Sequence, residues 1–445
     1  MVGVDKLIAS KKLIQAGDTL GVAVSGGADS MCLLHYLNSI KAKKKVKLVC
    51  ITINHGIRPT SKSEMEFVVS YCNKNEIEVV SFSGKVLDDL KKGQSLEMAA
   101  RDFRYGIFEK LLKDGVVNKI ALGHHLQDQT ETILLNILRG TGLAGAAGMD
   151  PVRKGKYLRP LLTTPKAEVM AYIAANDIPY MEDESNENTE FSRNYIRNVV
   201  MPLIRTRWKN ADQAFNHFAA ICKLDDDYIN STITEDGILL EDANTVRIPI
   251  TYFVNHLSVL KRLILRCAKK IGANVDVEDK HLDAIINLAL KGENGTSINL
   301  PKRLVALKEY NYLTLTNRSY KAEVQSWSFK LGKTDIDTYG VIEIKRSKLE
   351  EMKNFNHLVD AKKIPKKAVW RTRLEGDTFT KFGGGTKNLG DYLTDIKVPK
   401  RLRSIVPVLA VGSDILIVAG VEISDKVKVD KDSKTVYGIN AVRFR

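Results

Sequence analysis

A short glycine-containing segment near the N-terminus constrains the fold of this chain most strongly. It joins an apolar run over residues 20–24 to a helix-like run over residues 31–37. Its members are Ser25, Gly26, Gly27, Ala28, Asp29 and Ser30. Glycines let a backbone approach a ligand closely, and the unpaired N–H groups of a first helical turn attract anions. The segment therefore predicts a strand, a tight turn and a helix N-terminus that together bind a phosphate.

Side chains in this segment narrow the prediction. Ser25 and Ser30 supply hydroxyl donors, and Asp29 is a candidate ligand for Mg²⁺ or, alternatively, a helix cap. The segment lacks both the GK[ST] ending of a P-loop and the spacing of a dinucleotide-binding turn. It resembles the pyrophosphatase loop SGGxDS, which implies cleavage of ATP between its α and β phosphates. An ordinary helix cap after a strand is the alternative.

Length and charge limit the kinds of protein that the chain can form. At 445 residues it is too long for one ordinary core, so we expect two or three domains. The formal net charge of +15 indicates a polyanionic partner, either nucleic acid or an anionic membrane. No apolar run approaches the roughly 20 residues of a spanning helix, and the N-terminus lacks a secretory signal. We expect a cytoplasmic protein with no membrane partner.

The pattern of the first 139 residues alternates between strands and helices. We predict strands over residues 20–24, 46–53, 77–82 and 119–122, and helices over 63–73 and 95–112. This alternation is typical of an α/β fold with a parallel, doubly wound sheet, whose ligands bind beyond the carboxyl ends of the strands. A mainly helical domain and a small, mixed, strand-rich domain follow. We place the three domains at residues 1–206, 207–323 and 324–445.

A second polar segment follows the last predicted strand of the sheet. Asp128 and Glu131 lie three residues apart at the start of a predicted helix and share one face. Such carboxylates can coordinate Mg²⁺ or accept a proton from an attacking amine, with His124 as a neighbour. Helix capping by Asp128 and a structural role for His124 are the alternative.

A third pattern places Arg101, Arg104 and Tyr105 at helical spacing. An arginine at this position can pair bidentately with a phosphate or a carboxylate. A surface arginine that pairs with nearby acids is the alternative.

Taken in order, these motifs resemble the tRNA(Ile)-lysidine synthase family of PP-loop enzymes. The matching segments are SGGADS (25–30), NHGIR (54–58), residues 100–105, HHLQDQTET (124–132), RGTGLAG (139–145), RPLL (159–162), DESN (183–186) and RNYIR (193–197). Residues 371–379 and 396–403 resemble the last domain of that family. Two positions depart from it: Lys381 stands where a proline is expected, and Asn388 where a second lysine is usual.

The resemblance implies ligation of L-lysine to C2 of the wobble cytidine of isoleucine tRNA with a CAU anticodon. ATP and Mg²⁺ would be the cofactors, an adenylated cytidine the intermediate, and AMP and pyrophosphate the by-products, so that the tRNA reads AUA in place of AUG. We expect Asp128 and Glu131 to bind the lysine ammonium and help remove its proton, beside His124. Arg104 would neutralise the α-phosphate during attack.

Basic residues predict the contacts with tRNA, although a solvated surface charge is the alternative for each one. The candidates are Arg193, Arg197, Lys387, Lys397, Lys400, Arg401 and Arg403. A homodimer is compatible with the sequence.

Three other functions remain open at this point. A tRNA thiolase with the same loop would use paired cysteines, whereas the five cysteines here form no CxxC pair. A non-catalytic RNA-binding protein would hold ATP only as a structural or regulatory ligand. An amide-forming ligase would need a source of ammonia, and the sequence has no glutaminase signature.

Overall fold

The computed structural model describes residues 1–57, 61–84, 86, 90, 94–182, 192–273, 277–318, 323–336 and 339–443. The chain divides into two compact units, Met1–Tyr228 and Ile229–Arg445. Three of the sequence motifs, at residues 54–58, 183–186 and 193–197, touch or adjoin the gaps. Arg58 and the whole DESN segment lie outside the described residues.

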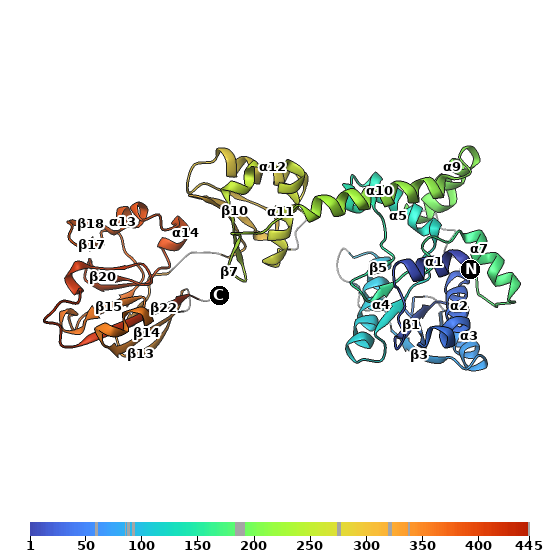
Figure 1. Ribbon diagram of the computed structural model, residues 1–445, viewed down its shortest axis with the longest axis horizontal. Helices are drawn as coiled ribbons and strands as arrows, with labels where there is room; N and C mark the ends of the chain where they lie inside the picture. The colour runs from blue at the N-terminus through green and yellow to red at the C-terminus, as the bar shows by residue number, and fades with distance from the viewer. Residues whose placement is uncertain are drawn as a thin grey trace. The chain divides into compact units, whose positions relative to one another are not determined.

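The first unit is built around a six-stranded sheet with the order β3-β2-β1-β4-β6-β5 (Figure 1). Its strands are β1 (Thr19–Val24), β2 (Lys47–Asn54), β3 (Glu78–Ser83), β4 (Lys119–Ala121), β5 (Val152–Arg153) and β6 (Tyr157–Leu158). All neighbours pair in parallel except β5 and β6. The four predicted strands are confirmed to within about two residues, and the parallel α/β class with them.

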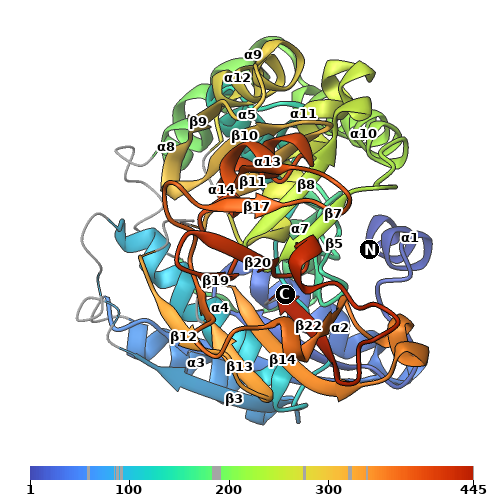
Figure 2. The same ribbon diagram turned by 90° about the vertical axis from the view of Figure 1, so that its left-hand side faces the viewer.

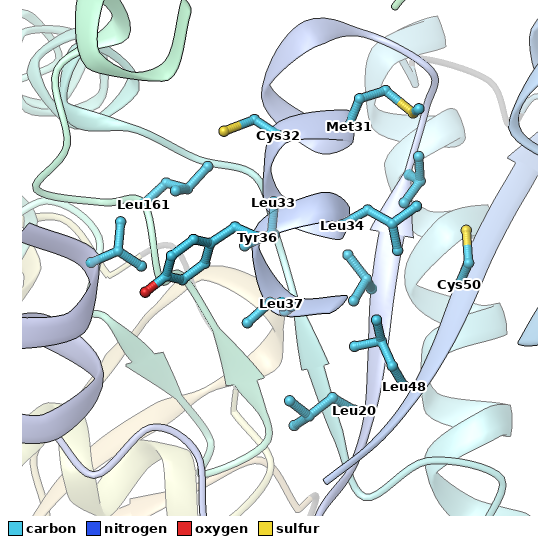
Figure 3. Close-up of a cluster of buried hydrophobic side chains, with 14 of the residues drawn as sticks. Leu20, Met31, Cys32, Leu33, Leu34, Tyr36, Leu37, Leu48, Cys50 and Leu161 are labelled. Carbon is cyan, nitrogen blue, oxygen red and sulfur yellow. The ribbon is translucent and has the colours of Figure 1, made fainter. Parts of the chain in front are cut away.

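Helices cover both faces of this sheet because β2 is apolar on both sides. Leu48 and Cys50 pack in a core with Leu34 of α2 (Figure 3). Val49 and Ile51 pack in a second core against α4. The first core holds α1 (Val2–Ser10), α2 (Ala28–Lys44), α3 (Ser61–Lys74) and α7 (Lys166–Ala175); the second holds α4 (Leu96–Lys113). Such near-continuous apolar strands are typical of a doubly wound parallel sheet.

The remaining helices of this part of the chain follow β4. They are α5 (Leu126–Leu138), α6 (Leu143–Ala146), α8 (Ser192–Tyr195), a π-helical turn (Ile196–Val200), α9 (Met201–Arg207) and α10 (Ala211–Ser231).

The second unit begins with a five-stranded antiparallel sheet of order β7-β8-β11-β10-β9. The strands are β7 (Leu239–Asp242), β8 (Thr245–Pro249), β9 (Ser297–Asn299), β10 (Val305–Glu309) and β11 (Tyr312–Thr316), and α11 (Leu257–Lys270) and α12 (Asp279–Lys291) share their core. A mainly helical domain was predicted over residues 207–323, and α10, α11 and α12 agree with it. The sheet was not predicted, because its strands are three to five residues long and give little periodic signal.

The rest of the second unit is rich in strands, as predicted. One sheet has seven strands: β12 (Ser326–Ser328), β16 (Val369–Arg371), β17 (Thr378–Thr380), β18 (Thr386–Asn388), β19 (Val408–Val411), β20 (Asp414–Val418) and β21 (Glu422–Ile423). The other has four: β13 (Gly332–Ile336), β14 (Gly340–Ser347), β15 (His357–Asp360) and β22 (Val436–Arg443). Figure 2 shows β13, β14 and β22 side by side. Two helices, α13 (Leu389–Asp395) and α14 (Lys400–Arg403), precede β19.

Among the described residues, no helix is long and apolar enough to cross a membrane.

Candidate active site

The predicted phosphate loop forms the junction of β1 and α2. Gly26 has a φ of +94°, a conformation that a residue with a side chain rarely adopts, and Gly27 caps α2. The Ser30 hydroxyl donates to the Gly27 carbonyl at 2.9 Å and accepts the Ser25 N–H at 3.2 Å. Gly123, at the end of β4, allows a close approach, since a Cβ there would lie 3.3 Å from the backbone of Asp29. The loop is therefore a preformed anion-binding turn at a helix N-terminus.

This loop lines a cavity of about 730 Å³, the main cavity, at the carboxyl ends of the strands. Five of the six predicted loop residues line it: Ser25, Gly27, Ala28, Asp29 and Ser30. Gly26 supplies the turn. The same cavity is lined by four of the other candidates, Arg104, His124, Asp128 and Arg197. The structure thus brings the phosphate loop and the polar segment after β4 into one site, as the parallel-sheet rule predicts.

Asp29 contacts two residues that were not predicted. The ammonium of Lys166, the first residue of α7, donates to Asp29 Oδ1 at 2.6 Å. The imidazole Nε2 of His125 lies 3.6 Å from Asp29 Oδ2 and 3.5 Å from Asp128 Oδ2. Since His125 Nδ1 accepts the Gln127 N–H, a neutral His125 carries its proton on Nε2, between the two carboxylates. His125 therefore links the phosphate loop to Asp128.

Asp128 and Glu131 form an ionic cluster with Arg193 and Arg197. Arg197 donates to Glu131 Oε1 at 2.7 Å and to Asp128 Oδ1 at 3.0 Å, and Arg193 donates to Glu131 Oε2 at 2.9 Å and to Asp128 Oδ1 at 3.0 Å. Two carboxylates and two guanidiniums balance in charge. Both arginine side chains are engaged with this carboxylate pair, and their role as tRNA contacts stays a prediction.

The two carboxylates differ in access. Asp128 lines the main cavity, and it also caps α5, since its Oδ2 accepts the His125 N–H at 3.0 Å. Burial alone would raise the pKa of Asp128. The electrostatic effect of nearby His125 and Arg193, together with the hydrogen bond from the His125 N–H, outweighs burial and lowers this pKa. A second cavity of about 440 Å³ shares Arg101 and His124 with the main cavity. Glu131 is only 1% exposed and lines neither of the two cavities. Asp128 therefore caps α5 and is also accessible from the cavity, so its catalytic role stays a prediction, while Glu131 is better placed to hold the two arginines than to contact a substrate.

His124 and Arg104 are the two remaining candidates. Burial lowers the pKa of His124 to about 4, so its imidazole is neutral at pH 7, and Nδ1 has no hydrogen-bond partner within the described part of the chain. Burial also lowers the pKa of Arg104, which stays cationic. Arg104 lines the main cavity and makes no hydrogen bond or ion pair with another described residue, which suits a guanidinium that binds an anion.

The predicted tRNA contacts of the second unit fall into two groups. Lys387, Lys397 and Lys400 are exposed, and Lys387 lies 3.1 Å from Asp395. Arg401 is 8% exposed and donates to Glu309 Oε1 and Oε2 at 3.1 Å, and it also bonds to Glu241. A buried, doubly paired guanidinium is poorly placed to reach a phosphate, and the role of Arg401 as an RNA contact stays a prediction for experiment to decide. Arg403 donates to Val398 O at 2.8 Å and to Thr394 Oγ1 at 2.7 Å, so its role in RNA binding stays a prediction.

The two departures from the family pattern have local explanations. Asn388 caps α13, its side chain accepting the Gly390 N–H at 2.8 Å. Lys381 lies over the ring of Tyr392 at 5.2 Å and 3.7 Å from Asp395.

Comparisons with known proteins agree with this geometry. The PP-loop domain family matches residues 4–204, and the TilS substrate C-terminal domain family matches residues 368–439. The chain is 32% identical to tRNA(Ile)-lysidine synthase of Clostridium acetobutylicum, over 98% of both chains. It is also 32% identical to that of Caldanaerobacter subterraneus subsp. tengcongensis, over 97% of this chain and 95% of the relative. Among solved structures, a U34-tRNA thiolase of Methanococcus maripaludis is 17% identical with a TM-score of 0.43, over 50% of this chain and 78% of that one.

The phosphate loop, the parallel sheet and the family match define an ATP-using PP-loop enzyme. Within that class, the near-complete match to curated relatives shows that the chain belongs to the tRNA(Ile)-lysidine synthase family, and the protein is a ligase. The family resemblance inferred from the motifs is confirmed.

Proposed function

We propose that this protein joins L-lysine to C2 of the wobble cytidine of isoleucine tRNA with a CAU anticodon, using ATP and releasing AMP and pyrophosphate. The observation that supports this most strongly is that the phosphate loop and Asp128 line the same cavity. An activated base and an incoming amine must meet, and this cavity offers both an anion site and a carboxylate. The reaction would change codon reading from AUG to AUA.

The residues around Asp29 fit Mg²⁺ bound together with a triphosphate. Among the described residues no group of three or more His, Cys, Asp or Glu side chains forms a metal site. Mg²⁺ commonly binds proteins through one or two carboxylates, with water and substrate phosphates as its other ligands. Asp29 would supply that carboxylate, and Mg²⁺ would stabilise charge on the leaving pyrophosphate. The N–H groups at the start of α2 and the ammonium of Lys166 would bind the same phosphates.

In the first step, O2 of the cytosine attacks the α-phosphate and pyrophosphate leaves. Negative charge grows on the phosphate oxygens, so cations and N–H groups fixed in advance lower the barrier. Arg104 lines the cavity without an ion-pair partner among the described residues, and we assign it to the α-phosphate.

In the second step, the ε-amine of lysine attacks C2 and AMP leaves. A free lysine amine has a pKa near 10.4, so it must lose a proton before it attacks. Asp128 is ionised at neutral pH and lines the cavity, which suits it to bind the ammonium. We also assign to Asp128 the proton that the amine gives up as it attacks C2. Glu131 would act indirectly, by holding Arg193 and Arg197 against Asp128. His124, neutral at pH 7, would border the reacting groups.

The exposed lysines Lys387, Lys397 and Lys400 are the proposed tRNA contacts of the second unit. A cytoplasmic location and a homodimer stay predictions.

Release of pyrophosphate tests the proposal against its alternatives. We expect the purified protein to release pyrophosphate from ATP continuously only when both the isoleucine tRNA and lysine are present, because the first step needs the tRNA and further turnovers need lysine. Continuous release without RNA, or with RNA and a sulfur donor in place of lysine, would contradict the proposal. Absence of ATP cleavage under every condition would favour a non-catalytic RNA-binding protein.

A further inference from the structure

The side chain of Gln127, the second residue of α5, connects segments around the phosphate loop. Its Oε1 accepts the N–H of Lys166 at 2.9 Å, and its Nε2 lies 3.5 Å from Asp212 Oδ2. The backbone N–H of Gln127 donates to His125 Nδ1 at 3.2 Å. Lys166 and His125 in turn both contact Asp29. Gln127 therefore touches two neighbours of the carboxylate in the phosphate loop.

The start of α7 depends on the bond from Lys166 to Gln127. Lys166 is the first residue of α7, and the first N–H groups of a helix have no partner within the helix. The preceding residue is Pro165, whose side chain makes no capping hydrogen bond. Gln127 supplies the missing acceptor from α5. This bond fixes the backbone from which the Lys166 side chain reaches Asp29.

Asp212 determines which way the Gln127 amide faces. The amide oxygen must face the N–H of Lys166, so the amide NH₂ group faces Asp212, whose carboxylate can only accept. The reversed amide would set a donor against a donor and an oxygen against a carboxylate. The two contacts thus select one orientation of the side chain.

Asp212 is itself held in place. It is only 5% exposed, and Arg205 of α9 donates to its Oδ2 at 2.9 Å and to its Oδ1 at 3.0 Å. Burial alone would raise the pKa of Asp212, but hydrogen bonds from Arg205, Thr130 and Gln127 outweigh burial and lower it. A bidentate, charge-assisted pair of this kind has a defined geometry. The turn between α9 and α10 therefore presents a fixed anion to Gln127.

We propose that Gln127 is a positioning residue for the phosphate site. Held by Asp212, it fixes the start of α7 and so places the Lys166 ammonium beside the bound phosphates. Neither Gln127 nor Asp212 lines either of the two cavities, so both act through Lys166 without touching the substrate. This inference rests on the proposed function for the assignment of Lys166 to those phosphates.

The test asks whether Gln127 acts through Lys166. Isothermal titration of the full chain measures the Kd of inorganic pyrophosphate and of AMP. Gln127→Met keeps the length of the side chain but removes its acceptor and its donor. We expect it to raise the Kd of pyrophosphate by about fivefold or more and that of AMP by less than about twofold.

The decisive variant combines Gln127→Met with Lys166→Gln. It should bind pyrophosphate as weakly as Lys166→Gln alone, because the losses of two residues that act as one unit do not add. The matched control is Gln213→Met, since Gln213 is an exposed glutamine at the start of α10 that lines neither cavity.

A swapped pair keeps the inference testable if Gln127→Met does not fold. Gln127→Glu alone sets a carboxylate against Asp212 and should weaken pyrophosphate binding. Adding Asp212→Asn again places an amide opposite a carboxylate, with the total charge of the pair unchanged. The swapped pair should therefore recover most of the binding.

Additive losses in the combined variant, or equal losses for pyrophosphate and AMP, would show that Gln127 only stabilises the fold and would overturn the inference. Unchanged pyrophosphate binding in folded Gln127→Met would overturn it too, as would a folded swapped pair that binds no better than Gln127→Glu. These titrations need neither tRNA nor lysine. Failure of the proposed function therefore looks different: the Kd values change as expected, but no lysidine appears in the tRNA.

Discussion

Lys166 and Asp29 lie 137 positions apart in the sequence, and Lys166 Nζ donates a hydrogen bond of 2.6 Å to Asp29 Oδ1. The lysine backbone is fixed as well, because its N–H donates to the Gln127 side chain at 2.9 Å. Both side chains line the main cavity. The ammonium is therefore held at the edge of the phosphate loop, within reach of any anion bound there.

The first prediction concerns this ammonium. Lys166→Gln should weaken binding of inorganic pyrophosphate by about tenfold or more, because a cation within reach of its phosphates is removed. Binding of AMP should change little. Titration of both ligands measures this, with Lys113→Gln, an exposed lysine at the end of α4 outside both cavities, as the control. Equal losses for pyrophosphate and AMP would point to a structural role instead.

Asp128 is the subject of the second prediction. Asp128→Asn keeps an oxygen that can cap α5 but removes the negative charge beside the amine, so turnover should fall by about 100-fold or more while ATP affinity stays within about threefold. Single-turnover lysine transfer and ATP titration give the two values. Normal turnover would remove Asp128 from the reaction.

Glu131→Gln is the control for Asp128→Asn, because Glu131 pairs with the same two arginines as Asp128 but lines neither cavity. We expect this variant to lose about 3 kcal/mol of stability in the first unit, as when one partner of a buried ion pair is removed. Its activity should fall less than that of Asp128→Asn at a temperature where both variants are folded.

The third prediction separates buried from exposed basic residues of the second unit. Arg401→Gln should lower the stability of this unit by about 3 kcal/mol, because Glu309 and Glu241 lose their buried partner, and leave tRNA affinity nearly unchanged. The double variant Lys397→Gln and Lys400→Gln should do the reverse, weakening tRNA binding and reducing its salt dependence. Urea unfolding and binding at several salt concentrations measure both. A large loss of tRNA affinity in folded Arg401→Gln would contradict this expectation and establish Arg401 as an RNA contact.

The fourth prediction follows from the pKa of His124, which is about 4 in the folded chain against 6.5 for a free imidazole. Between these values the unfolded chain binds the extra proton, so stability is full above pH 6.5 and is lost as the pH falls toward 4. The loss attributable to His124 is at most roughly 3 kcal/mol. His124→Gln should flatten this part of the stability profile of the first unit. His357, whose pKa burial also lowers to about 4, provides an unaltered reference in the second unit. An identical profile in the variant would show that His124 does not titrate in this way.

The sequence was most informative where a pattern is local. The phosphate loop, four strands of the first sheet and the helices after them follow from apolar periodicity and glycine placement, and the structure confirms them. The sheet of β7 to β11 did not follow, because its short strands are stabilised mainly by pairing across the sheet and by the core that they share with α11 and α12.

Side-chain partners in the site depended on contacts between distant segments. In the sequence, a buried arginine cannot be told from a solvated arginine that binds RNA. Only the folded chain shows that Arg193 and Arg197 pair with Asp128 and Glu131. The same holds for Arg401, which pairs with Glu309. Lys166 and His125 were missed for the same reason. Two signals were available in the sequence. Lys166 follows Pro165, which is typical of a helix start, and His125 lies beside His124. Neither signal indicates a contact with Asp29.

The most direct test of the account is the incorporation of radiolabelled lysine into two tRNA transcripts by the purified protein with ATP and Mg²⁺. One is isoleucine tRNA with a CAU anticodon, and the other is methionine tRNA with the same anticodon. We predict label in the isoleucine tRNA alone, at the wobble cytidine. No label in either tRNA, despite tRNA-dependent cleavage of ATP, would contradict the account and indicate a different RNA modification.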